Sequence, residues 1–231
     1  MLRRFQSIIV LPFTATVSLL AHAHGDLDVR IATLTAQLAQ NPTNALLWLQ
    51  SADLHRQHGE TTAALAEINQ ANKLKPHWAA TELQLARIRW DEKNFRATIA
   101  AATACLAIEP AAPDALVLRA RSHAALGQLT NAVTDLDAVF ATAAVPLPDL
   151  YLERARWQAT LGKLDDALRG LDDGMKRLGH TPSLALPAID FERQRGTFTA
   201  ALERLDKARN FFDAKSFARL REEILAQAET K

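Results

Sequence analysis

Residues 59–64 read GETTAA, and the same pattern returns as GQLTNA at 127–132, GKLDDA at 162–167 and GTFTAA at 196–201. Each copy is a glycine followed five residues later by an alanine. The four glycines lie 68, 35 and 34 residues apart, so a period near 34 predicts one more unit with Lys93 at its glycine position. A period of this length is typical of an array of helical hairpins. Such arrays are usually binding surfaces rather than catalysts.

Small residues fill two columns of this repeat. The column five residues after the glycine position holds Ala64, Thr98, Ala132, Ala167 and Ala201, and the column seven residues before it holds Ala52, Ala86, Ala120, Ala155 and Ile189. Small side chains let paired helices approach closely, and a glycine between them ends the first helix in the left-handed conformation. Asn94 tolerates that conformation too, so we expect the unit at Lys93 to form the same hairpin.

The first unit resembles the tetratricopeptide repeat (TPR) family in both period and residue pattern. The matching positions are Trp48, Ala52, Gly59, Ala64, Ile68, Ala71 and Pro76, and Tyr151 stands where the pattern has Trp in the fourth unit. The tyrosine position of the pattern departs from it, since His55, Arg89, His123, Gln158 and Glu192 occupy it. The resemblance implies an all-α fold, a right-handed α-solenoid of about five TPR hairpins with capping helices at both ends.

The repeat also predicts the organisation of the chain. We expect a signal peptide at 1–23, an N-terminal cap at 24–42, a TPR array at 43–212 and a C-terminal capping helix at 213–231. The caps are predicted as helices over Asp26–Gln40 and Asp213–Glu229. Pro187 falls inside the first helix of the fifth repeat, so that helix is expected to start late or to kink. The repeats are expected at about 45–78, 79–112, 113–147, 148–181 and 182–212.

The first 23 residues have the pattern of an export signal. Arg3 and Arg4 precede an apolar stretch from Phe5 to Leu20, and Ala21-His22-Ala23 is a small-residue cleavage pattern. We therefore expect export to the bacterial periplasm, with an inner-membrane anchor as the alternative if the segment is retained. Its removal changes the net charge from +1 to −1, because it holds two arginines and no acid. A near-neutral chain gives no reason to expect nucleic-acid binding, and membrane association is expected only if the segment is retained.

The resemblance implies that the first helix of each hairpin lines a concave groove. Arginines follow one groove position through successive repeats, and their planar forks suit carboxylates. We therefore predict a non-enzymatic scaffold that holds an extended, acidic peptide. The alternative is that these arginines pair with acids of the chain itself, such as Glu82, Asp91, Asp114, Asp149 or Glu153. The predicted groove residues are Arg56, Arg87, Arg121, Arg156, Arg193, Asp53, Asp190, Leu49, Leu83 and Leu152.

Residues for catalysis or cofactor binding are not evident in the sequence, and we predict neither. His55 and His58 are three residues apart, but the repeat places no further ligand near them, so we interpret His55 as a helix-packing residue. His24 would lie at or near a mature N-terminus and could bind copper there, which makes a metal-binding accessory a less favoured alternative. Cys105, the single cysteine, is interpreted as a small packing residue rather than a reactive thiol.

Overall fold

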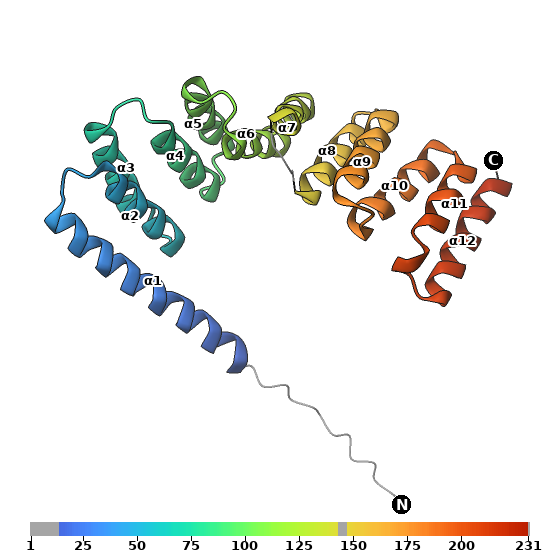
Figure 1. The fold of residues 1–231 in the computed structure, drawn as a ribbon, viewed down its shortest axis with the longest axis horizontal. Coiled ribbons are helices and arrows are strands. Elements are labelled where there is room, and N and C mark those ends of the chain that lie inside the picture. Colours follow the sequence, from blue (N-terminus) through green and yellow to red (C-terminus); the bar gives the residue numbers. More distant parts are fainter. Residues whose placement is uncertain (1–13, 143–146, 231) are drawn as a thin grey trace, which may run out of the picture. The chain divides into compact units, whose positions relative to one another are not determined.

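The computed structural model describes residues 14–142 and 147–230, with side chains from residue 26 onward. This part of the chain holds twelve α-helices, one 3-10 helix and no strand (Figure 1). The predicted signal segment lies mostly outside it, as does the side chain of His24. The helices are α1 (Thr14–Gln40), α2 (Ala45–His58), α3 (Thr61–Leu74), α4 (Ala79–Asp91), α5 (Phe95–Ile108), α6 (Pro113–Ala125), α7 (Leu129–Thr142), α8 (Pro148–Thr160), α9 (Leu164–Leu178), α10 (Pro182–Arg195), α11 (Phe198–Lys207), η1 (Arg209–Phe211) and α12 (Ala214–Glu229).

The chain forms two compact units, residues 1–88 and residues 89–231. Unit 1 contains α1, α2, α3 and most of α4, and α2 packs against both α1 and α3. Unit 2 contains the end of α4 and the helices from α5 onward. Within it, α6 packs against α7, α8 against α9, α10 against α11, and α11 against α12.

The turn inside each hairpin has the predicted left-handed residue. Gly59, Gly127, Gly162 and Gly196 have φ between 74° and 86°, and Lys93 has φ 57°. The unit at Lys93 forms the expected hairpin, but Lys93 and not Asn94 adopts the left-handed conformation, since the φ of Asn94 is −85°. Asn94 instead caps α5, with its side-chain oxygen accepting a hydrogen bond of 3.2 Å from the Ala97 amide.

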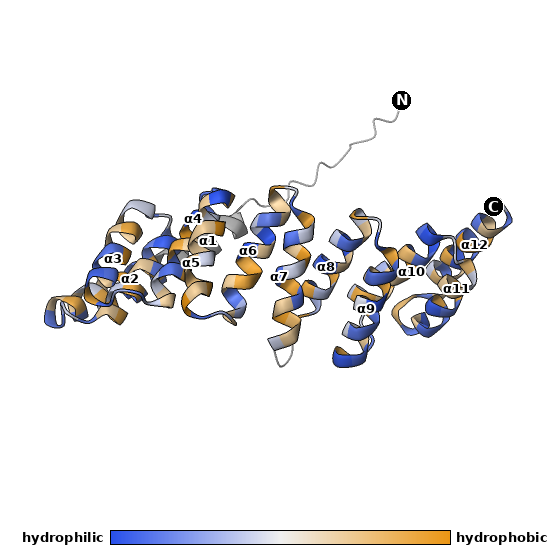
Figure 2. Ribbon diagram, turned by 90° about the horizontal axis from the view of Figure 1, so that it is seen from above, coloured by the Kyte–Doolittle hydropathy of each residue, from blue (hydrophilic) through white to orange (hydrophobic). Residues whose placement is uncertain are grey.

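The two columns of small residues form the contacts between helices. All ten residues are at most 1% exposed. Longer apolar side chains complete the cores: Ile68 and Ile88 in unit 1, and Leu168, Leu171 and Leu205 among those of unit 2. Figure 2 shows hydrophobic and hydrophilic residues mixed along each helix, as expected for helices that bury one face. Cys105 is 1% exposed, which confirms its interpretation as a packing residue.

Two helices begin earlier than the sequence suggested. Helix α1 starts at Thr14 rather than Asp26. It passes through Gly25, because a single glycine weakens a helix by about 1 kcal/mol without ending it. Helix α10 starts at Pro182, so the late start expected from Pro187 is wrong. Helix α10 continues through Pro187, which lies inside it and removes the hydrogen bond that its own amide would have donated.

Among the described residues, no helix is both long and apolar enough to cross a membrane.

Candidate functional site

Unit 1 has a groove of about 500 Å³ between three helices, within the usual size range of binding sites. We call it the N-terminal groove. Four of the predicted site residues line it, namely Leu49, Asp53, Leu83 and Arg87. Among the described side chains, its lining is Arg30, Thr33, Leu34 and Gln37 of α1, Leu49, Gln50, Asp53 and Leu54 of α2, and Ala80, Leu83, Gln84 and Arg87 of α4.

Helical spacing explains why these residues share one surface. Leu49 and Asp53 are four residues apart on α2, as are Leu83 and Arg87 on α4, and residues four apart lie one above the other on a helix face. Asn44 fixes the start of α2, since its side-chain oxygen accepts hydrogen bonds from the next helix residues, including one of 3.0 Å from the Leu46 amide. Each of these two helices therefore contributes a leucine to the groove and, one turn later, a charged residue. We call Leu49 and Leu83 the leucine floor.

Asp53 is the centre of a hydrogen-bond network within this groove. Arg56 donates to it over 3.0 Å and Gln57 over 2.7 Å, and Gln84 of α4 donates to it as well. Partial burial alone would raise the pKa of Asp53. The hydrogen bonds from Gln84, Arg56 and Gln57, with the charge of Arg56, outweigh that effect and hold the pKa below its usual value. Asp53 is therefore ionised at neutral pH.

Arg87 is oriented by the same network. Its Nη1 donates a hydrogen bond of 3.1 Å to the Gln84 side-chain oxygen, while the Gln84 amide donates to Asp53. The lining contains two arginines, Arg30 and Arg87, and one aspartate, Asp53, so the formal charge of the groove is positive. The arrangement can accept an anion beside an apolar surface.

The other predicted site residues do not line this groove. Arg121 of α6 donates to both carboxylate oxygens of Glu153 on α8, with Nη2 at 2.9 Å, which is the internal pairing weighed as the alternative. Arg193 pairs with Asp190 at 3.3 Å and donates to Gln227 at 2.9 Å.

Two of the remaining predicted residues lie apart from these ion pairs. Leu152 packs partly buried against the unit 2 core, and Arg156 is exposed. Arg87 belongs to unit 1, whereas Arg121 and Arg156 belong to unit 2. The structure thus gathers part of the predicted set in one groove and distributes the rest.

One wall of the groove was missed by the sequence analysis, because α1 was interpreted as a cap. Arg30, Thr33, Leu34 and Gln37 all face the groove from α1. Their spacing is that of one helix face, and this was the signal available. However, α1 lies outside the repeat, so its residues could not be aligned with the groove positions of the hairpins.

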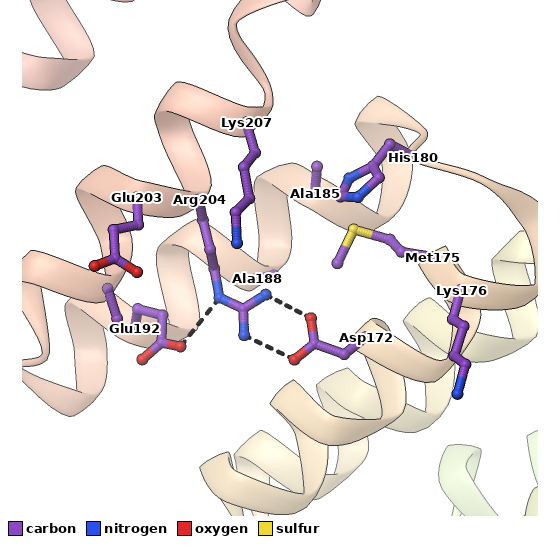
Figure 3. Close-up of a pocket in the computed structure, with 11 residues that line it drawn as sticks. Asp172, Met175, Lys176, His180, Ala185, Ala188, Glu192, Glu203, Arg204 and Lys207 are labelled. Carbon is purple, nitrogen blue, oxygen red and sulfur yellow. Dashed lines mark hydrogen bonds and ion pairs between the residues drawn. The ribbon is translucent and has the colours of Figure 1, made fainter.

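A second hollow, of about 480 Å³, lies in unit 2 between α9, α10 and α11, and we call it the C-terminal hollow (Figure 3). None of its lining residues was predicted from the sequence as a site residue. Its lining is Asp172, Met175, Lys176, His180, Ala185, Ala188, Glu192, Ala200, Glu203, Arg204 and Lys207.

Arg204 connects the three helices of this hollow. Its Nη1 and Nη2 donate to the two carboxylate oxygens of Asp172 at 2.5 and 2.9 Å, and its Nε donates to Glu192 at 3.0 Å. Hydrogen bonding to Asp172 is the main reason that the pKa of Arg204 lies above its usual value. Burial opposes this effect, and Glu192 adds to it. Two of the five guanidinium N–H groups take no part in these three bonds.

The two neighbouring histidines of α2 are engaged by carboxylates. His55 lies 2.7 Å from Glu67 of α3, and His58 lies 3.2 Å from both Glu60 and Asp28. His55 thus joins α2 to α3, in agreement with its interpretation as a packing residue. Within the described part of the chain, no three side chains of His, Cys, Asp or Glu are grouped to hold a metal ion.

The sequence matches no protein-family model and no curated protein sequence. Solved structures are similar to it. YrrB, described as a TPR protein with an unusual peptide-binding site, superposes with a TM-score of 0.65 at 17% identity over 82% of this chain and 97% of its own. PilW, a type IV pilus biogenesis factor, gives 0.64 at 21% identity over 84% and 90%. A TPR protein of Parabacteroides merdae gives 0.60 at 20% identity over 89% and 82%.

These similarities establish the fold. Together with the consecutive packed helices, they show an all-α solenoid of helical hairpins of the TPR type, which confirms the predicted fold class. At this level of identity they show the fold alone.

Proposed function

We propose that this chain is a non-enzymatic scaffold that holds an extended, acidic segment of another protein in the N-terminal groove. The observation that carries the proposal is the pairing of two arginines, Arg30 and Arg87, with a leucine floor in one groove. Arginine forks bind carboxylates in two-pronged fashion, and the leucines accept apolar side chains between them.

Polar side chains of the groove also suit an extended backbone. Gln37 and Gln50 each offer an amide that can donate to a peptide carbonyl and accept from a peptide N–H. Arg87 is already held by Gln84, so less side-chain freedom is lost when it binds a carboxylate. The groove is therefore organised before a partner arrives.

The similar structures support this proposal in general terms. YrrB is described as having a peptide-binding site, and PilW as a factor in pilus biogenesis. With the export pattern of residues 1–23, they favour a scaffold working in the bacterial periplasm. A membrane-tethered scaffold of an envelope complex is the second candidate, favoured by the apolar stretch from Phe5 to Leu20. N-terminal sequencing of the exported protein distinguishes the two, since only the first loses the stretch.

An array of synthetic ten-residue peptides tests the proposal. It contains leucine-bearing peptides whose other residues are acidic, neutral or basic, and it is probed with the wild type and with Arg30→Gln/Arg87→Gln. We expect acidic peptides to bind best, and their affinity to fall about tenfold or more in the double variant. Arg219→Gln is the matched control, because Arg219 is an exposed arginine of α12 that neither lines the groove nor belongs to the predicted set.

Two results would overturn the proposal: equal binding of acidic and basic peptides, or full binding by a folded double variant. A further pair, Arg121→Ala/Arg156→Ala, tests whether the site extends beyond unit 1. Loss of affinity in that pair would extend the binding surface along the predicted arginine positions. Unchanged affinity would confine the site to the N-terminal groove.

A further inference from the structure

We propose that the C-terminal hollow is a second binding site, whose ligand is a carboxylate joined to an apolar group. Lys207 and His180 would contact the carboxylate, and Met175 with Ala185 and Ala188 would hold the apolar part. This site lies on other helices than the N-terminal groove, so the inference does not depend on the function proposed for that groove.

The floor of the hollow is apolar because its side chains are small or flexible. Met175, Ala185 and Ala188 are at most 7% exposed, yet they line the hollow from α9 and α10. Two alanines leave room that larger side chains would fill, and a methionine adapts its shape to an apolar ligand. An apolar group placed there would be removed from water, which is favourable in proportion to the area buried.

Two nitrogen-bearing side chains point into this space. Figure 3 shows Lys207 extending from α11 toward the space between Arg204 and Ala188, and the His180 ring lying beside Ala185 and Met175. In the described part of the chain, the hydrogen bonds and ion pairs of this hollow join Arg204 to Asp172 and Glu192, and none involves the side chain of Lys207 or His180. Both therefore keep donors for a ligand beside the apolar floor.

The acids of the hollow are arranged so that they do not occupy these donors. Arg204 holds Asp172 and Glu192, and Glu203 lies on the far side of Arg204 from His180 and Met175 (Figure 3). The end of the hollow at Lys207 consequently carries a positive charge, and the His180 ring beside it can donate a hydrogen bond. A ligand with a carboxylate and an apolar group can contact both the donors at this end and the apolar floor. A wholly hydrophilic anion would contact only the donors.

Two sources share this chemistry, a free aliphatic acid and the last residue of a protein chain. Methionine NMR separates them, because the sequence has only two methionines, Met1 and Met175. In the full chain labelled with 13C at the methionine methyls, Met175 reports on the hollow and Met1 serves as a reference. The probes are 4-methylpentanoate, 4-methylpentanamide and acetate, and a short peptide ending in leucine with either a free or an amidated C-terminus.

We expect 4-methylpentanoate to move the Met175 signal in a saturable manner, and the neutral amide and acetate to leave it unchanged. Lys207→Gln and His180→Gln should each weaken this binding by about tenfold. Lys215→Gln is the matched control, since this lysine of α12 is exposed and does not line the hollow. A response to the free-terminus peptide but not to its amide would identify a chain terminus as the source.

Three results would overturn the proposal: no Met175 response to 4-methylpentanoate or to the free-terminus peptide at millimolar concentrations, an equal response to the amide forms, or undiminished binding by folded Lys207→Gln and His180→Gln. A peptide-array result for the N-terminal groove is independent of these outcomes, because none of its residues line the hollow.

Discussion

Arg204 on α11 donates a hydrogen bond of 3.0 Å to Glu192 on α10, whose side chain is only 6% exposed. The same guanidinium holds Asp172 of α9 by two further bonds. Thr197 also donates to Glu192, over 2.5 Å. One arginine thereby satisfies a buried carboxylate and joins the two helices of the last hairpin to the helix before it.

Replacement of Arg204 by methionine should lower the free energy of unfolding by about 2 kcal/mol, because the buried Glu192 would lose its nearest cation and keep only Arg195, at 4.0 Å. The loss is expected to be below that of a fully buried pair, since Arg204 is 20% exposed. Urea unfolding followed by circular dichroism measures it. In the double variant Arg204→Met/Glu192→Gln much of the loss should be recovered. A single variant as stable as the wild type would contradict the prediction.

Asp53→Asn should lower the free energy of unfolding at neutral pH by about 0.5–1 kcal/mol, a modest value because Asp53 is only partly buried. The pKa of Asp53 lies below its usual 3.8 in the folded protein, so its ionised form stabilises the fold. That contribution is complete above 3.8 and is lost as the pH falls through the lower, folded-state pKa.

Urea unfolding of the wild type and Asp53→Asn over a series of pH values checks this sign. The stability difference should shrink as the solution is acidified below pH 3.8. The Arg56→Gln background is the control, because it removes one of the donors to Asp53 and should reduce the difference at neutral pH. A difference that grows on acidification would contradict the assignment.

The repeat positions are the part of the fold that the sequence predicts well. Each of them depends on short-range rules: a left-handed residue ends a helix, and a small residue lets two helices meet. Even the irregular unit obeys them, since Lys93 adopts the left-handed conformation in place of glycine. The starts of the hairpin helices follow from the same register.

Side-chain pairing and hollows are harder to predict. Five acids were candidate partners for the arginines as a set, and only the geometry of α6 and α8 pairs Arg121 with Glu153. The C-terminal hollow is lined by three alanines, Ala185, Ala188 and Ala200, together with Met175. These residues do not belong to one column of the repeat. The groove wall on α1 lies outside the repeat, so no register could place it.

Gly174→Ala should destabilise the protein by about 1–3 kcal/mol, although alanine is the better helix former. A Cβ at Gly174 would lie 2.9 Å from the Tyr151 ring and 3.0 Å from Leu184, and both of those side chains are fully buried. Gly170→Ala is the comparison, because its Cβ would meet the end of the long Arg154 side chain, at 2.7 Å, rather than a buried ring. The Arg154 guanidinium pairs with Asp137 and lies over the Phe140 ring, so it must shift, and a smaller loss is expected. Calorimetry should show a lower melting temperature for both variants, with the larger decrease for Gly174→Ala. A rise in melting temperature in both variants would mean that helix propensity rather than packing decides both positions.

Lys93→Gly should stabilise the protein by about 0.5–1 kcal/mol, because a lysine at φ 57° is strained by its Cβ and glycine is not. Gly59→Ala should have the opposite effect and cost about 1 kcal/mol. At Gly59 the φ is 86° and a Cβ would have no atom within 4 Å, so any loss there reflects backbone conformation alone.

Urea unfolding of the two variants tests both signs. Lys93→Asn serves as an intermediate control, since asparagine tolerates the left-handed conformation better than lysine but less well than glycine. The order of stability at this position should be glycine, asparagine, lysine. A Lys93→Gly variant less stable than the wild type would show that the lysine side chain contributes contacts worth more than the relief of strain. Lys93 would then match Gly59 in backbone conformation, as the repeat predicts, but not in its effect on the free energy of unfolding.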